Sequence, residues 1–111
     1  MTDKIVVLCT CSSDDEAAKI SRLLVELRLA ACVNTLPGLR STYRWQGAIV
    51  DSAEFLLLIK TRRDLFQDLK AAIQSAHSYR VPEVIALPIV DGAVSYLEWL
   101  AKETREPDEE Y

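Results

Sequence analysis

Hydrophobic residues recur along this chain with two different periods, and the change of period predicts the elements of secondary structure. Residues 4–11 are mostly apolar or β-branched, which predicts a strand. A turn at Ser12 and Ser13 follows, and Ser13 forms a capping box with Glu16 three positions later. The next apolar residues have the spacing of one buried helix face, namely Ile20, Leu23, Leu24 and Leu27. We therefore expect a helix from Ser13 to about Arg28.

Extended structure is predicted for the middle of the chain. Residues 31–36 form the next expected strand, Pro37 and the glycine after it interrupt it, and residues 39–45 continue the extended conformation. A turn at Gly47 and the glutamine before it then leads to a third strand over residues 54–60.

The second half of the chain returns to a helical period. Thr61 and Asp64 suggest the start of a second helix, which stops near His77 and whose inner face is formed by Leu65, Leu69, Ala72, Ile73 and Ala76. A fourth strand is expected over residues 83–89, after Pro82. Asp91 and the following glycine then turn the chain into a short last helix with Val94, Leu97 and Leu100 on its inner face.

The predicted order is β, α, β, β, α, β plus one C-terminal helix. This order is that of the split βαβ, ferredoxin-like fold, an α+β class with an antiparallel sheet. We see no repeat or linker, and we expect a single domain over residues 1–102.

Both faces of the predicted sheet are apolar. Strand 4–11 alternates Ile5, Val7 and Cys9 with Val6, Leu8 and Thr10, although two helices can cover only one face. An uncovered apolar face predicts burial against another subunit, and we therefore expect an oligomer. The alternative is that the last helix and the long hairpin cover this face within one chain.

The net charge of −4 comes from the C-terminus. Residues 103–111 carry five acidic side chains and one basic side chain, whereas residues 1–102 carry twelve of each. We expect the acidic tail over 103–111 to be disordered. The neutral body argues against a nucleic-acid partner.

The three cysteines have no metal-finger spacing and are odd in number, so we expect reduced thiols in the cytoplasm. The first apolar run is too short for a signal peptide or a membrane span, and we expect no membrane partner.

The predicted topology gathers the reactive side chains at one end of the sheet. Cys9 and Cys11 lie on one face near the end of the first strand, His77 ends the second helix, and Glu83 begins the neighbouring strand. Thiolate and imidazole ligands together suit copper or zinc, and a carboxylate widens the choice.

Each of these residues also has an ordinary structural interpretation. A cysteine in a strand usually acts as a small buried hydrophobic residue, and we assign Cys32 to the core. His77 could bond the last carbonyls of its helix, and Glu83 could cap or pair with Arg80. The aromatic side chains could line a ligand pocket or pack at hairpins and interfaces, namely Tyr43, Trp45, Tyr79 and Trp99.

A series of residues along nearly the whole chain also resembles a known family signature: Leu29, Ala30, Ala31, Cys32, Val33, Asn34, Pro37, Gly38, Ser41, Tyr43, Trp45, Gly47, Lys60, Thr61, His77, Tyr79, Val81, Pro82, Glu83, Tyr96, Leu97 and Trp99. They look like the CutA divalent-cation tolerance proteins. The resemblance implies a ferredoxin-like protomer in a homotrimer, built like the PII signalling proteins, linked to copper and other divalent ions and without established catalysis.

Metal ligands carry over from the resemblance at two positions. Cys9 matches a cysteine that is a copper ligand in some members, and His77 matches the histidine of a His-Pro-Tyr turn. The chain departs from the pattern where Ser78 replaces that proline, where Ala76 replaces a second histidine found in some members, and where Cys11 stands in a turn that usually contains proline.

The leading hypothesis is a trimeric cytoplasmic metal-binding protein, not an enzyme, that acts in divalent-cation (copper) tolerance, with Cys9 and His77 as ligands and Glu83 as an auxiliary ligand. The second is a PII-like signalling or scaffold module whose intersubunit clefts bind a metabolite or a partner protein. An acyl-phosphate hydrolase would need an arginine-lined loop after the first strand, where this chain has serines and aspartates.

Overall fold

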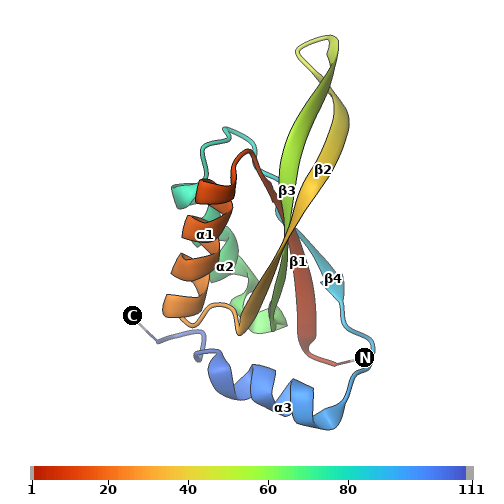
Figure 1. The fold of residues 1–111 in the computed structure, drawn as a ribbon. Coiled ribbons are helices and arrows are strands. Elements are labelled where there is room, and N and C mark those ends of the chain that lie inside the picture. The colour runs from red at the N-terminus through yellow and green to blue at the C-terminus, as the bar shows by residue number, and fades with distance from the viewer. Residues whose placement is uncertain (1, 110–111) are drawn as a thin grey trace.

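The computed structural model describes residues 2–109 and contains a four-stranded antiparallel sheet with the strand order β2-β3-β1-β4 (Figure 1). Helices α1 and α2 lie side by side on one face of the sheet, and α3 runs across its lower end. The bounds are β1 Lys4–Cys11, α1 Asp14–Glu26, β2 Cys32–Trp45, β3 Ala48–Arg62, a 3-10 turn η1 Arg63–Leu65, α2 Phe66–Ala76, β4 Ile85–Pro88 and α3 Val94–Glu103. The predicted ferredoxin-like α+β order is confirmed.

Helix α1 starts where its capping box predicts. Ser13 is extended, its Oγ accepts a hydrogen bond from the Glu16 amide at 3.1 Å, and the Glu16 carboxylate accepts one from the Ser12 amide at 3.4 Å. The helix ends at Glu26, two residues before the predicted Arg28, because Arg28 has a left-handed φ of 56° that cannot continue an α-helix.

The β2–β3 hairpin is longer than the sequence indicates and projects beyond the rest of the molecule (Figure 1). The expected break at Pro37 and Gly38 is only a register irregularity within β2, and β3 begins at Ala48, not at residue 54. The extra rungs mix polar and apolar residues: Tyr43 pairs with Val50, whereas Thr42 Oγ1 bonds Asp51 and Ser52 Oγ donates to Tyr43 Oη at 3.0 Å. Because these rungs lack apolar alternation, hydrophobic periodicity could not reveal them.

The start of the second helix and the length of β4 also differ from prediction. Thr61 does not begin a helix: it is the buried penultimate residue of β3, and its hydroxyl donates to the Leu29 carbonyl at 2.6 Å. The chain enters α2 through the 3-10 turn η1, and α2 ends before His77 as predicted. Strand β4 is Ile85–Pro88, shorter than the expected 83–89, because only these residues pair with β1.

The core lies between the sheet and helices α1 and α2. It consists of alternate residues of β1 and β3 with the inner faces of the helices; its fully buried members include Val7, Cys9, Cys11, Ile20, Leu24, Leu57, Ile59, Leu69 and Ile73. Cys32 was expected in the core, but it pairs with Lys60 on the opposite face and is only half-buried.

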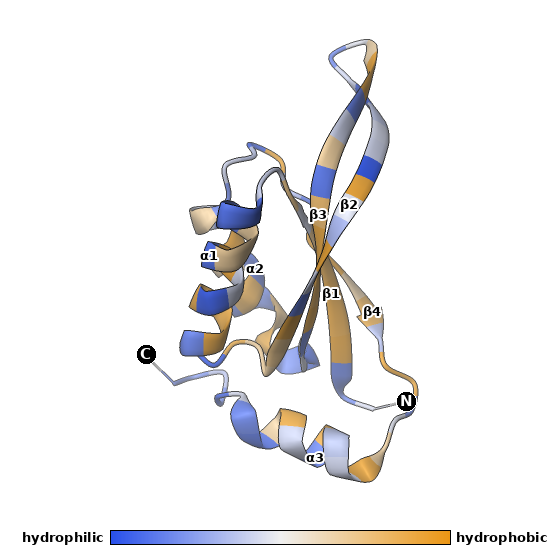
Figure 2. Ribbon diagram, in the orientation of Figure 1, coloured by the Kyte–Doolittle hydropathy of each residue, from blue (hydrophilic) through white to orange (hydrophobic). Residues whose placement is uncertain are grey.

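The opposite face of the sheet is open, as expected: Figure 2 shows no helix of residues 2–109 over it and shows β1 and β4 as largely hydrophobic. Leu36, Ile85 and Leu87 on this face are 41%, 51% and 49% exposed. Neither the hairpin nor α3 covers them, and Tyr96 and Trp99 of α3 are themselves 42% exposed. The alternative that one chain covers both faces is therefore wrong for the described residues.

The C-terminal segment begins as packed structure. The expected boundary at residue 102 lies within α3, and Thr104 is buried because Arg62 donates to its hydroxyl at 3.2 Å. The backbone amide of Arg105 donates to the Arg28 carbonyl at 2.8 Å. Disorder of the remaining acidic residues stays a prediction, and residues 110 and 111 lie outside the described residues.

Among residues 2–109, no helix is long and apolar enough to cross a membrane.

Candidate metal centre

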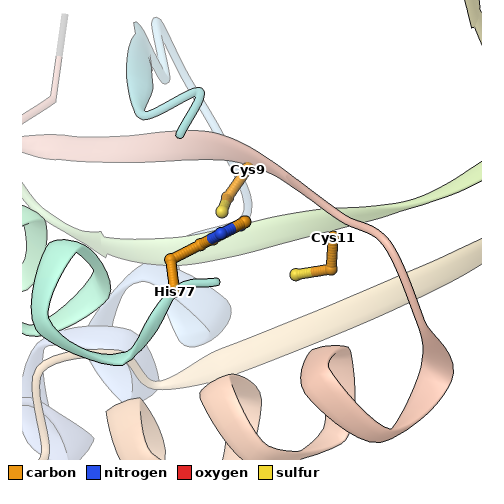
Figure 3. Close-up of side chains that lie close together, drawn as sticks. All are labelled: Cys9, Cys11 and His77. Carbon is orange, nitrogen blue, oxygen red and sulfur yellow. The ribbon is translucent and has the colours of Figure 1, made fainter. Parts of the chain in front are cut away.

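Cys9, Cys11 and His77 come together at the end of the sheet where β1 leads into α1 and α2 ends (Figure 3). Cys9 and Cys11 project from β1 toward the helices, and both are fully buried. His77 is the C-terminal cap of α2, and its side chain has no exposed area. The two sulfurs and one imidazole nitrogen all lie within 4.8 Å of one another. These three side chains therefore lie together at the end of the sheet where the predicted topology places them.

Glu83 does not belong to this group of donors. It is exposed in the segment before β4, where it lines a neighbouring cleft. Its charge still reaches the cluster, because it is among the acidic groups that raise the pKa of the Cys9 thiol. Its role as an auxiliary ligand stays a prediction.

Both imidazole nitrogens of His77 hold hydrogen bonds to the backbone. The Tyr79 amide donates to Nδ1 at 3.0 Å, so Nδ1 carries no proton, and the protonated Nε2 donates to the Thr10 carbonyl at 2.7 Å. The ring is therefore held as one neutral tautomer. It bonds a carbonyl of β1 and not the last carbonyls of its own helix.

The two thiols are neighbours and shift each other's pKa in opposite directions. Cys11 and then burial raise the pKa of Cys9, whereas Cys9 lowers the pKa of Cys11 against the effect of burial. The Cys9 thiol itself donates to the Thr10 carbonyl at 3.8 Å. A metal that binds either sulfur has to displace the proton of that thiol.

Glu16 supports the cluster, and sequence reasoning assigned it only to the helix cap. Its Oε2 accepts a hydrogen bond from the Ser78 amide at 2.8 Å, and its Oε1 lies 4.0 Å from Nδ1 of His77. Burial raises the pKa of Glu16, but the bonds to Ser78, together with the effects of His77 and Ser12, lower the pKa overall. The capping-box position was the available signal, because it places Glu16 at the same end of the sheet as His77.

A cleft of about 660 Å³ adjoins the cluster. Its walls include Thr10, Tyr43, Trp45, Glu54 and Tyr79, and the Tyr79 hydroxyl donates to Glu54 at 2.5 Å. Tyr43, Trp45 and Tyr79 thus line a cleft, whereas Trp99 does not and packs instead against Tyr96 of α3. Binding of a ligand in this cleft stays a prediction. Thr10 and Tyr79 also bond His77, so the cleft and the cluster share a wall.

The fold and these side chains define a small ferredoxin-like protein with a buried thiol–imidazole cluster. Residues 5–103 match the model of the family described as CutA1 divalent ion tolerance protein. The chain belongs to this family, and the resemblance noted in the sequence is confirmed.

Relatives and solved structures agree with this membership. The chain is 52% identical to the divalent-cation tolerance protein CutA of Thermus thermophilus over 99 residues, which cover 89% of this chain and 96% of that protein. It is 46% identical to the chloroplastic CutA protein of Arabidopsis thaliana over 91% of its length, but spans 56% of the plant protein. The crystal structure of CutA from Xylella fastidiosa has a TM-score of 0.92 at 42% identity and covers 94% of this chain and 100% of the other.

Proposed function

We propose that this protein binds copper in the course of divalent-cation tolerance and that Cys9 and His77 are its ligands. The family description supplies divalent-ion tolerance. The observation that carries the proposal is the buried group of donors within 4.8 Å. Thiolate and imidazole are the ligands that copper and zinc prefer, so zinc is the alternative metal, and Glu83 is an auxiliary carboxylate.

The proposal assigns each side chain a defined task. Cys9 supplies a thiolate after losing its proton, and His77 supplies a neutral imidazole already oriented by Thr10 and Tyr79. Glu16 keeps the turn after α2 in place through Ser78. Copper, when bound, is held as cargo or signal, and no catalytic step is part of the proposal.

We further propose that the protein is a cytoplasmic homotrimer. The open apolar face with exposed Leu36, Ile85 and Leu87 supports assembly, because an apolar face of this kind is stabilised by burial. Three free cysteines support a reducing compartment.

Equilibrium dialysis against copper and zinc tests the metal proposal. Wild type is expected to retain one copper ion per chain, and His77→Ala to lose most of that binding. Cys32→Ser is the matched control, because Cys32 lies on the other face of the sheet. Equal copper retention by wild type and His77→Ala would contradict the proposal.

The second candidate is a PII-like signalling or scaffold module in which metal is incidental. The cleft of about 660 Å³ favours it, since aromatic and charged side chains line it. Under this function, Tyr43→Ala and Trp45→Ala impair the activity of the protein in cells while His77→Ala does not. The metal proposal expects the reverse order.

A further inference from the structure

We infer that Cys11 is a third ligand of the proposed copper site and that the site takes copper in the monovalent state. This inference rests on the proposed function, because it presumes that Cys9 and His77 bind metal. It adds a buried second sulfur to the ligands Cys9 and His77, and this sulfur lies closer to them than the exposed carboxylate of Glu83 does.

The three donor atoms have to move only a short distance to reach a common metal ion. Because the donor atoms lie within 4.8 Å of one another, some point lies within about 2.8 Å of all three. Bonds to such metals are about 2.3 Å from sulfur and about 2.0 Å from nitrogen, so each donor has to move inward by about half an ångström to one ångström. Side-chain rotation can supply a movement of this size.

Cys11 is better placed than either nearby carboxylate. It shares the helix-facing side of β1 with Cys9, and Figure 3 shows its sulfur on the side of His77. Glu83 is exposed and outside the group of donors. Glu16 already accepts hydrogen bonds from the Ser12 and Ser78 amides, and leaving them would release both turns that flank the cluster.

The donor set favours copper(I) over zinc. Thiolates are soft ligands that suit copper(I), which is stable with three ligands. Zinc sites in proteins are usually four-coordinate, with a fourth protein ligand or a water molecule. Among the described residues, no histidine, cysteine or carboxylate joins the group as a fourth donor. Cys9 and Cys11 have no exposed area. On binding, each thiol that becomes a ligand releases its proton to solvent, and copper is already monovalent when it arrives.

Competition for copper(I) tests the inference. Full-length protein is titrated without oxygen against a colorimetric copper(I) chelator, with thiols kept reduced, for wild type, Cys9→Ser, Cys11→Ser, Cys11→Ala, His77→Ala, Glu83→Gln and Cys32→Ser. Both substitutions of Cys11 are expected to weaken copper(I) binding about tenfold or more, since a direct ligand is lost. Glu83→Gln is expected to weaken binding less than either substitution of Cys11, because the Glu83 carboxylate lies outside the group of donors, and Cys32→Ser is expected to match wild type. X-ray absorption at the copper edge is expected to show two sulfur and one nitrogen neighbour in wild type and one sulfur neighbour in Cys11→Ala.

Circular dichroism of the metal-free variants separates misfolding from ligand loss, and Cys11→Ala keeps the test valid if Cys11→Ser does not fold. If Cys9→Ser and His77→Ala lose copper while both Cys11 variants bind as wild type does, the inference is overturned and the proposed function stands. If wild type itself takes up no copper, both fail. A site that prefers zinc over copper(I) overturns the assignment of the monovalent metal.

Discussion

The two ends of the sheet each bury a nitrogen-rich side chain, but they hold it in different ways. At the lower end, Arg62 donates to fixed oxygens, among them the Thr104 hydroxyl and the Arg105 carbonyl at 2.8 Å, and it pairs with Asp64. At the upper end, His77 has two backbone bonds and lies beside two thiols. Arginine keeps its charge and offers no lone pair, whereas neutral imidazole can exchange a hydrogen bond for a metal. At one end the buried polar side chain is fully used in holding the C-terminal segment, whereas at the other end the imidazole has the lone pairs that the proposed metal binding requires.

The largest expected effect is at the lower end of the sheet. Arg62→Met is expected to lower the free energy of unfolding by about 3 kcal/mol, because the oxygens of Thr104 and Arg105 lose their buried donor. Urea unfolding followed by circular dichroism measures this loss. The neighbouring exposed Arg63→Met is the control and should change stability by less than about 0.5 kcal/mol. Equal losses in the two variants would remove the structural role of Arg62.

Bound copper(I) should stabilise the folded protein only where His77 is present to bind it. Copper(I) at about 100 times its dissociation constant is expected to raise the free energy of unfolding of wild type by about 2.7 kcal/mol and to leave His77→Ala unchanged. Arg62→Met, although less stable, should gain as much as wild type. Urea unfolding with and without copper(I) measures each gain. A gain that survives in His77→Ala would place the metal elsewhere.

Metal binding should also weaken a hydrogen bond in the turn after α2, where the Tyr79 amide donates to His77. If Nδ1 binds the metal, the Tyr79 amide loses its acceptor; if Nε2 binds, the proton moves to Nδ1 and opposes that amide. In both cases the Tyr79 amide loses its hydrogen bond to His77, and exchange of the Tyr79 amide proton is expected to quicken by about twofold to tenfold. Hydrogen exchange followed by nuclear magnetic resonance measures the change. The amide of His77, bonded to Ile73 at 2.8 Å, is the internal reference. Unchanged exchange at Tyr79 in the copper-loaded protein would contradict this coupling.

The smallest expected effect concerns Glu16 and depends on pH. Because the folded pKa of Glu16 lies below its ordinary value of 4.5, its ionised form stabilises the fold above that pH, and the contribution is lost as pH falls through the folded pKa. Glu16→Gln is expected to cost about 1 kcal/mol at pH 7 and to converge on wild type as pH falls through the lowered pKa of the folded Glu16 carboxyl. Thermal unfolding across this range tests the sign. A difference that persists unchanged in acid would show that charge is not the cause.

The grouping of Cys9, Cys11 and His77 at the upper end of the sheet was predictable, because alternate residues of a strand point to opposite faces of the sheet. Cys9 and Cys11 had to share a face, and the order of elements brought His77 to the same end. Glu83 lies in the loop between α2 and β4, and no periodic pattern predicts the direction of a loop side chain. The structure places it outside the group of donors.

The parts of the fold that could not be predicted are those without apolar periodicity. The outer rungs of the β2–β3 hairpin, which mix polar and apolar residues, extend β3 back to Ala48. The buried hydroxyl of Thr61 belongs to a strand, although threonine is a common helix cap. The anchoring of Thr104 by Arg62 joins residues 42 positions apart, which no local pattern encodes.

Native mass spectrometry with copper(I) tests the central claim most directly, because it reports subunit number and bound metal in one spectrum. Wild type is expected to appear as a trimer with one copper ion per chain, and Cys11→Ala as a trimer with less copper. A lone chain that carries no copper would contradict the account.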